Sequence, residues 1–576
     1  MARSLQKWKV GIAAAALLAF ITALPQIYLC YARWPEWNGS CAFLDTDEFA
    51  YAAYTNALID GRPRRSDPYT GNDDSRFETL FSIQFLPAYS VALSARVTRI
   101  SASTAFILIL PIACIAAVLM LLWFFWELTS NVTLATVGAF GVLSLGTIAA
   151  LNPLQILTGL QDGGFFFPFV RRYVPALVFP IFIASTLFVW RALTRNFAWA
   201  VPAGLAFAIL VYSYFFLWTA AIAWFCTIII LWFIGRPQDR KKVGQVLATL
   251  LVAGTIALVP YAWLLMQRTK GMDTSHLLEM THVPDFFRAP ELYGALVLSV
   301  LAYILRRRTL VWRDPKVLFA ASFAIAPFLV FNQQVLTGRS LQSFHYEQFV
   351  TNYWVVMAGF LALGIAGGNL SRRIVSYLAV AGLIIGFMLG IRAARMTISM
   401  NTQLDEARGA ALRLREHQGG TVLASDLLLA NAVVINSRHS VLWARHLFTF
   451  SNVDLVGQKR RFYQYLYYLG VDEARLAREL QNDFTARWEI FGAQRANPVL
   501  ALRNKPVSQE EINYAASEYA TFVRSFDASL AANPLLSYAV VKPSDDLSHL
   551  DQWYERSLVG SKGDLLVYSL KLKAAR

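Results

Sequence analysis

The sequence contains little charge for its length. Only 15% of its 576 residues are Asp, Glu, Lys or Arg, whereas about a quarter is usual in a soluble protein. Hydrophobic residues make up 56% of the chain. This composition excludes an ordinary water-soluble enzyme and predicts a protein embedded in a membrane.

Cysteine is scarce as well. The chain has four cysteines and no CxxC or Cys/His spacing, which argues against a structural zinc site. Cys30 and Cys41 flank the first loop between apolar segments. Two states remain open for them: a disulfide, if this loop lies in an oxidising compartment, or two thiols.

Apolar runs long enough to cross a bilayer recur along the first two thirds of the chain. A spanning helix needs about 20 such residues, and only helices satisfy the backbone of these segments inside lipid. No clear cleavage site follows the first run, so it is predicted to be a retained helix. Eleven spans are predicted, at residues 10–32, 104–126, 131–151, 174–193, 197–213, 215–234, 244–266, 289–305, 316–332, 350–367 and 374–392.

The positive charge of the chain predicts the orientation of these spans. A net charge of +15 in a soluble protein would suggest a nucleic-acid partner. Here the Lys and Arg residues cluster in short loops on one side ("RALTRN", "GRPQDRKK", "RRRTLVWRDPK", "GGNLSRR"), as the positive-inside bias requires. We therefore predict no nucleic-acid partner, an inner amino terminus, and outer loops at 33–103, 152–173, 267–288 and 333–349.

Two segments outside the spans have a pattern of their own. In the first outer loop, residues 47–60 have helical spacing. Residues 79–98 are interrupted by Pro87 and are predicted to lie along the membrane interface, because counting them as a span would invert every later loop. From residue 394 onward long apolar runs stop, and strand and helix patterns alternate.

The chain is thus predicted to be a polytopic α-helical membrane protein with a carboxy-terminal extracytoplasmic α/β domain. The predicted domains are 1–393, which includes the first outer loop, and 394–576. The second domain has no Gly-rich phosphate loop and no Ser/His/Asp spacing that would make it catalytic alone.

The outer loops hold most of the unusual polar residues, which are costly at membrane depth unless they line a cavity. The stretch "CAFLDTDEFAYAAY" carries Asp45, Asp47 and Glu48. Acids are favoured at helix N-termini by the backbone dipole, so a purely structural explanation exists for all three. The other outer loops supply Asp162, Arg171, Arg172, Arg339 and His345.

In this order the motifs resemble the GT-C superfamily of polytopic glycosyltransferases, which use sugars carried on a polyprenyl phosphate. The "DE" after the first span is similar to the motif of the protein mannosyltransferase and aminoarabinose transferase branches. "TGLQDGG", with Asp162, resembles the second acidic loop of the family, and "NQQVLTGRSLQSFHYEQF" resembles a late loop that approaches the lipid carrier.

The resemblance implies transfer of a sugar from a polyprenyl-phosphate donor to a lipid, glycan or protein acceptor at the extracytoplasmic face. Asp47 is then the general base, and Asp45 or Glu48 shares this role or orients the acceptor. Arginine stabilises a leaving phosphate, which favours Arg171 and Arg172, followed by Arg339 and His345. The alternatives are snorkelling to headgroups for the two adjacent arginines and a local hydrogen bond for the histidine.

The same residues leave open whether the reaction uses a divalent cation. Asp45-Thr46-Asp47 has the D-x-D form that holds Mg²⁺ or Mn²⁺ with a substrate phosphate. The second acidic loop has a lone Asp162 where the oligosaccharyltransferase branch has a D-x-D, and this departure favours a reaction without a required cofactor.

Two other functions compete with glycosyl transfer. One is a transporter or flippase, although transporters usually bury ionisable residues in their spans. The other is a polymerase or ligase of lipid-linked oligosaccharides. Ala/Arg-rich composition and compact loops favour a bacterial inner membrane as the location.

Overall fold

The computed structural model describes residues 2–150, 167–268, 272, 278–307, 311–450, 455–496 and 506–574. The chain divides into two compact units. Met1–Tyr28, Phe106–Trp263 and Glu279–Thr397 form the first, here called the helical unit. Leu29–Ala105, Leu264–Leu278 and Ile398–Arg576 form the second, here called the α/β unit.

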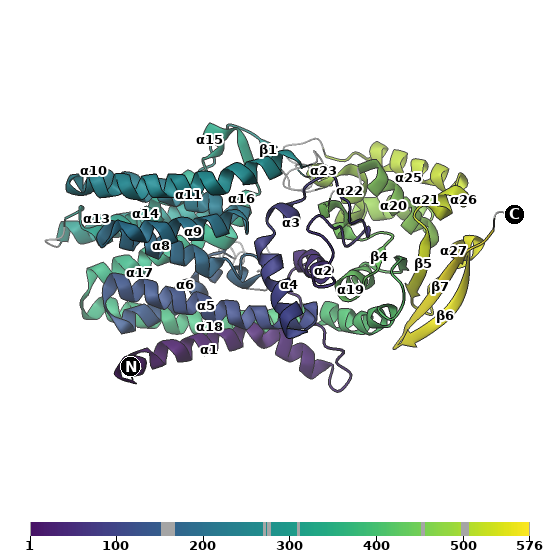
Figure 1. Cartoon of the computed structure of the whole chain (residues 1–576), viewed down its shortest axis with the longest axis horizontal. Helices are drawn as coiled ribbons and strands as arrows, with labels where there is room; N and C mark the ends of the chain where they lie inside the picture. Colours follow the sequence, from purple (N-terminus) through teal and green to yellow (C-terminus); the bar gives the residue numbers. More distant parts are fainter. Residues whose placement is uncertain are drawn as a thin grey trace. The chain divides into compact units, whose positions relative to one another are not determined.

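Each of the eleven predicted spans corresponds to a helix (Figure 1). These helices are α1 Ala2–Ala32, α5 Ala102–Thr129, α6 Val132–Ala150, α8 Phe179–Thr194, α9 Ala200–Val211, α10 Phe215–Gly235, α11 Arg240–Met266, α13 Ala289–Arg307, α14 Pro315–Val330, α17 Asn352–Ala366 and α18 Gly368–Leu414. Within the described ranges, nine segments are helical, long and apolar enough to cross a membrane. The other two, α8 and α9, are apolar helices of 16 and 12 residues. The prediction of a polytopic helical membrane protein is confirmed.

Aromatic side chains hold the helical unit together. Trp224 of α10 stacks on Phe323 of α14 with ring centroids 5.0 Å apart, and its indole N–H donates to Ser322 at 3.0 Å. Phe182 of α8 stacks on Trp354 of α17 at 5.5 Å. Each such pair adds about 1 kcal/mol to the burial of its rings, so the neighbouring helices have a fixed register.

Short elements complete the helical unit. They are the 3₁₀ turns η1 Pro168–Val170, η2 Phe197–Trp199 and η3 Pro237–Asp239, the helices α15 Gln334–Thr337 and α16 Ser343–Tyr346, and the π-helical turn η4 Glu347–Thr351. The strands β1 Leu278–Met280 and β2 Arg339–Leu341 form a two-stranded sheet.

The first loop of the α/β unit folds into three helices. They are α2 Asp47–Ile59, α3 Leu80–Ile83 and α4 Leu86–Thr98, so the helix predicted at 47–60 is confirmed. The predicted interruption of 79–98 is also found, and Pro87 lies in the first turn of α4, where its missing N–H costs no hydrogen bond. The placement of α4 along the interface stays a prediction.

A five-stranded mixed sheet forms the centre of the carboxy-terminal part, which confirms the predicted α/β domain. Its order is β4-β3-β5-β7-β6. The strands are β3 Thr421–Ala424, β4 Ser440–Val441, β5 Leu536–Val541, β6 Tyr554–Lys562 and β7 Leu565–Leu572. β3 runs parallel to β4 and β5, whereas β7 is antiparallel to both β5 and β6.

Helices connect the strands of this sheet in the chain. They are α19 Leu427–Asn436, the 3₁₀ helix η5 Arg445–Phe450, α20 Leu455–Tyr468, α21 Glu473–Asn482, α22 Phe484–Phe491, α23 Ala493–Ala496, α25 Gln509–Arg524, α26 Ala528–Ala532 and α27 Ser548–Trp553. Tyr463, Tyr467, Tyr519 and Phe526 belong to the apolar core between helices and sheet. Tyr467 stacks on Phe526 with ring centroids 3.8 Å apart.

The first loop packs against the carboxy-terminal part within one unit. α2 lies against α19, and the Asn56 side-chain amide donates to the carbonyl of Ser437 at 2.9 Å. Asp405, fully buried, accepts hydrogen bonds from the backbone amides of Asn38 and Ser40. The compact units therefore follow a different boundary from the predicted domains, which placed this loop with the spans.

The cysteines are thiols throughout. Cys30 is half-buried and Cys41 is buried, and no disulfide joins any of the four cysteines, all of which lie in the described ranges. Of the two states that the sequence left open, the structure therefore has the thiol pair.

A buried acid in α22 makes the stability of the α/β unit depend on pH. Glu489 accepts a hydrogen bond from the Trp443 indole at 3.2 Å. Burial raises its pKa from an ordinary value of 4.5 to about 8, against the opposing effects of Trp443 and the charge of Arg445. The folded state thus holds this proton more tightly than the unfolded state.

The free energy of unfolding should therefore fall as the pH rises from about 4.5 to about 8, and then level off. The total loss is about 1.4 kcal/mol for each unit by which the folded pKa exceeds the unfolded pKa. We expect Glu489→Gln to remove this slope, because the amide stays neutral. Thermal unfolding of the purified protein between these pH values measures it. Glu555→Gln, at an exposed position of β6, is the matched control, and equal slopes in the two variants would contradict the prediction.

Candidate functional site

The three acids of the first loop occupy different environments at the start of α2. Asp45 Oδ1 accepts the backbone N–H of Asp47 at 3.1 Å, which forms the turn that leads into the helix. Glu48 is fully buried and accepts the backbone N–H of Leu44 at 2.9 Å. The Asp47 side chain remains 48% exposed. Asp45 and Asp47 are both partly exposed, so an acceptor can reach either, whereas Glu48 has a buried structural contact.

A histidine from the carboxy-terminal part lies next to Asp47. His446 of η5 is 4% exposed, and its Nε2 is 4.0 Å from Asp47 Oδ1. Burial, together with the charge of Arg445, lowers its pKa to about 3 in spite of nearby Asp45. The imidazole is neutral at physiological pH, so this contact is not an ion pair.

Aromatic rings, most of them buried, form a continuous packed cluster beside these groups. Phe81 of α3 stacks on Phe450 of η5 with centroids 4.5 Å apart. Tyr51 and Tyr54 of α2 contact Phe81 edge-on and tilted, at 5.9 and 5.5 Å. Phe49 meets the edge of the His446 ring at 6.4 Å. The cluster joins the start of α2 to α3, next to which a charged network lies.

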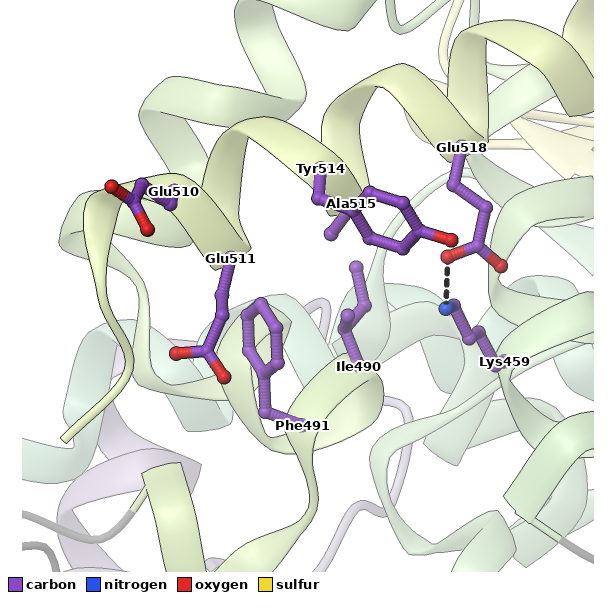
Figure 2. Close-up of a pocket in the computed structure, with 8 residues that line it drawn as sticks. All are labelled: Lys459, Ile490, Phe491, Glu510, Glu511, Tyr514, Ala515 and Glu518. Atoms are coloured by element: carbon purple, nitrogen blue, oxygen red, sulfur yellow. Dashed lines mark hydrogen bonds and ion pairs between the residues drawn. The ribbon is translucent and has the colours of Figure 1, made fainter. Parts of the chain in front are cut away.

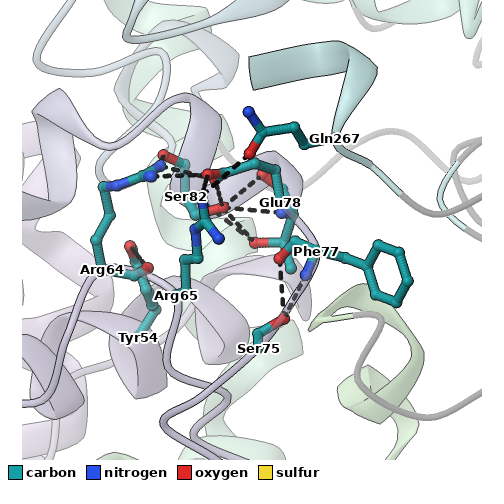
Figure 3. Close-up of polar contacts among 9 residues, drawn as sticks. Tyr54, Arg64, Arg65, Ser75, Phe77, Glu78, Ser82 and Gln267 are labelled. Atoms are coloured by element: carbon teal, nitrogen blue, oxygen red, sulfur yellow. Dashed lines mark hydrogen bonds and ion pairs between the residues drawn. The ribbon is translucent and has the colours of Figure 1, made fainter. Parts of the chain in front are cut away.

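This network centres on a buried glutamate (Figure 3). Glu78 is fully buried and accepts two hydrogen bonds from Arg64, both at 2.7 Å. Arg65 approaches the same carboxylate at 2.8 Å, and the Ser82 hydroxyl donates to it at 2.6 Å. Arg65 also donates to the Gln267 side chain at 3.1 Å. Two guanidinium groups therefore share one carboxylate, which leaves one net positive charge.

The Glu78 carboxylate is held ionised by its partners. Burial alone would raise its pKa, but the hydrogen bonds from Arg64 and Ser82 and the charges of both arginines outweigh burial and lower the pKa below 4.5. The side chains of Arg64 and Arg65 are 26% and 34% exposed. They can therefore present unused N–H groups to an anion.

The predicted phosphate ligands Arg171 and Arg172 lie in the helical unit, each 2% exposed. Arg171 donates to the Val174 carbonyl at 3.1 Å and to the Tyr214 hydroxyl at 3.0 Å. Arg172 donates to the Phe106 carbonyl at 2.8 Å. Protein covers both side chains, and their role in phosphate binding or in contacts to headgroups stays a prediction.

The second pair of predicted phosphate ligands also belongs to the helical unit. Arg339 begins β2 and is exposed. The ring centroid of His345 lies 4.5 Å from that of Phe216 and 5.3 Å from that of Phe349. Asp162 lies outside the described residues. Because the three first-loop acids belong to the α/β unit, their convergence with these groups stays a prediction.

Sequence reasoning missed His446, Arg64 and Arg65. No spacing links His446 to Asp47, which is 399 positions earlier (446 − 47). The arginines did carry a signal, because "GRPRRSD" is a basic run in a loop predicted to lie outside, against the positive-inside bias. A basic segment on the wrong side of the membrane indicates a local use for its charge.

A separate cavity of about 520 Å³ lies between α20, α22 and α25 (Figure 2). Two of its three acids have partners: Glu518 pairs with Lys459, and Glu511 accepts two hydrogen bonds from Arg495. Neither Asp47 nor His446 lines it. Asp47 of the first loop is therefore a stronger candidate for the reaction than this cavity.

The described residues hold no group of three or more His, Cys, Asp or Glu side chains arranged for a metal ion. Asp45 and Asp47 form a pair, with one oxygen of Asp45 engaged by the backbone. We derive no step through a metal, and metal dependence stays untested.

Comparison with known proteins gives distant structural likenesses, seven in number, and no match in sequence. No known family matches the sequence, and no curated protein does. Among solved structures, the chain is similar to ArnT from Cupriavidus metallidurans, described as bound to undecaprenyl phosphate. The identity is 11% and the TM-score 0.42, over 96% of this chain and 97% of that chain.

Proposed function

We propose that the protein is an integral membrane glycosyltransferase of the GT-C type. It transfers a sugar from a polyprenyl-phosphate donor to an acceptor on the extracytoplasmic side, in a bacterial inner membrane. The observation that carries the proposal is the half-exposed Asp47 carboxylate at the start of α2, beside a neutral buried histidine and a buried aromatic cluster. The many apolar helices place the protein in the bilayer, where a lipid-linked donor lies.

In the proposed reaction Asp47 accepts the proton of the acceptor nucleophile. The acceptor atom attacks the anomeric carbon, the bond between this carbon and the phosphate oxygen breaks, and the polyprenyl phosphate leaves with both electrons. A positioned general base contributes about a hundredfold or more. Asp45 holds the turn that orients Asp47, and Glu48 anchors the same turn through Leu44.

The leaving phosphate needs cations that it can reach. Arg64 and Arg65 are partly exposed, belong to the same unit as Asp47, and share one counter-charge. We propose that they bind the donor phosphate, since arginine pairs well with phosphate oxygens. The exposed Arg339 is a second proposed contact. Arg171, Arg172 and His345 remain predicted contributors whose present contacts are all within the protein.

The purified protein in lipid vesicles provides the test. A donor with radiolabelled sugar on a polyprenyl phosphate is supplied together with a membrane extract as the acceptor source. We expect a covalently labelled product and release of free polyprenyl phosphate. Passage of label across the vesicle without any covalent product would support the transporter instead, and transfer of whole oligosaccharides would support the polymerase or ligase.

A further inference from the structure

We infer that His446 is a positioning residue for Asp47, through which the carboxy-terminal part completes the active site. The inference deepens the proposed glycosyl transfer and rests on it. His446 stands in η5, in the carboxy-terminal part, and Asp47 stands in the first loop, so the two residues meet only in the folded α/β unit.

The surroundings of the ring determine which nitrogen carries the proton. Nδ1 is buried and has no hydrogen-bond partner in the part of the chain that the structure describes. A proton there would leave a buried N–H without a hydrogen bond, which is unfavourable. It would also turn the lone pair of Nε2 toward the Asp47 carboxylate. The tautomer protonated at Nε2 avoids both penalties.

His446 therefore presents an N–H to Asp47 across 4.0 Å. This distance is about 1 Å too long for a hydrogen bond, and catalytic contacts commonly shorten when substrate binds. A neutral donor orients the carboxylate without placing a full positive charge beside it.

Packing holds the ring in this orientation. Phe49 and Tyr69 contact it at centroid distances of 6.4 and 6.3 Å. Tyr69 is itself tied to the carboxy-terminal part, because its hydroxyl donates to Asn431 at 3.0 Å and its carbonyl accepts the Val441 amide at 2.9 Å. The charged groups near the ring are Asp45, Asp47 and Arg445.

Two substitutions that differ only in where they place a donor test the inference. His446→Gln puts an amide N–H near the position of Nε2, whereas His446→Asn puts it near Nδ1. We expect the Gln variant to transfer sugar within about threefold of wild type. The Asn variant should lose about ten- to a hundredfold in kcat, because Asp47 is displaced by up to about 1 Å, with the donor KM changed less than twofold.

His439→Asn is the matched control. His439 is another buried histidine of the same unit, 2% exposed, whose ring contacts Tyr538, and we expect its replacement to leave kcat unchanged. Equal activity in the Gln and Asn variants of His446, whether both active or both impaired, would overturn the inference. Absence of transfer by the wild-type protein would instead refute the proposed function.

Discussion

Replacing Asp47 with Asn should lower the rate of sugar transfer by about a hundredfold or more. The amide has the size of the carboxylate but cannot accept the acceptor's proton, so the contribution of general-base catalysis is lost. The side chain is half-exposed, and the turn before α2 is held by the Asp47 backbone amide rather than by its carboxylate. The variant should therefore fold and insert normally.

Initial rates with a saturating polyprenyl-phosphate sugar measure this prediction. The loss should appear in kcat, because a proton transfer occurs only in the transition state. Asp74→Asn removes an exposed acid of the same loop and should leave the rate unchanged. Transfer by Asp47→Asn at the wild-type rate would remove this carboxylate from the mechanism and return it to the role of a helix-start acid.

The sequence predicted the large elements well, for a physical reason. A bilayer requires long apolar helices, and this requirement appears in every predicted span from α1 to α18. The alternation of strand and helix after residue 394 was equally clear. β6 gives a weaker signal, because its burial pattern is irregular and most of its residues are at least partly exposed, so the period-2 alternation of a half-buried strand is absent.

The site was predicted less well, because its geometry depends on contacts between distant segments. Local rules found Asp47 at a helix start, but they did not separate it from Glu48, whose burial depends on tertiary packing. They favoured Arg171 and Arg172 from their place beside a span, whereas the fold buries both. His446 became recognisable only when η5 was placed against α2.

Replacing Glu78 with Gln should destabilise the α/β unit by about 3 kcal/mol. Removing one partner of a buried ion pair costs about 3–5 kcal/mol. The lower end applies because Arg64 and Arg65 are partly exposed and solvent screens their charge. In the Gln variant, Arg64 and Arg65 lose the carboxylate that they share in Figure 3. The two guanidinium groups then repel each other and separate. If Arg64 and Arg65 bind the donor phosphate, the rate of sugar transfer should also fall.

The pH dependence separates this ion pair from ordinary packing. The pKa of Glu78 is lowered in the folded state, so its stabilisation is fully present above the unfolded value near 4.5 and is lost as the pH falls through the folded value. Glu78→Gln should lack this acid-side loss in thermal unfolding. Asp73→Asn is the control, because Asp73 pairs with Arg62 at 2.7 Å in the same loop but is 48% exposed, and such pairs contribute about 0–1 kcal/mol. If both variants unfold at the same temperature, the buried carboxylate does not hold the two arginines in place.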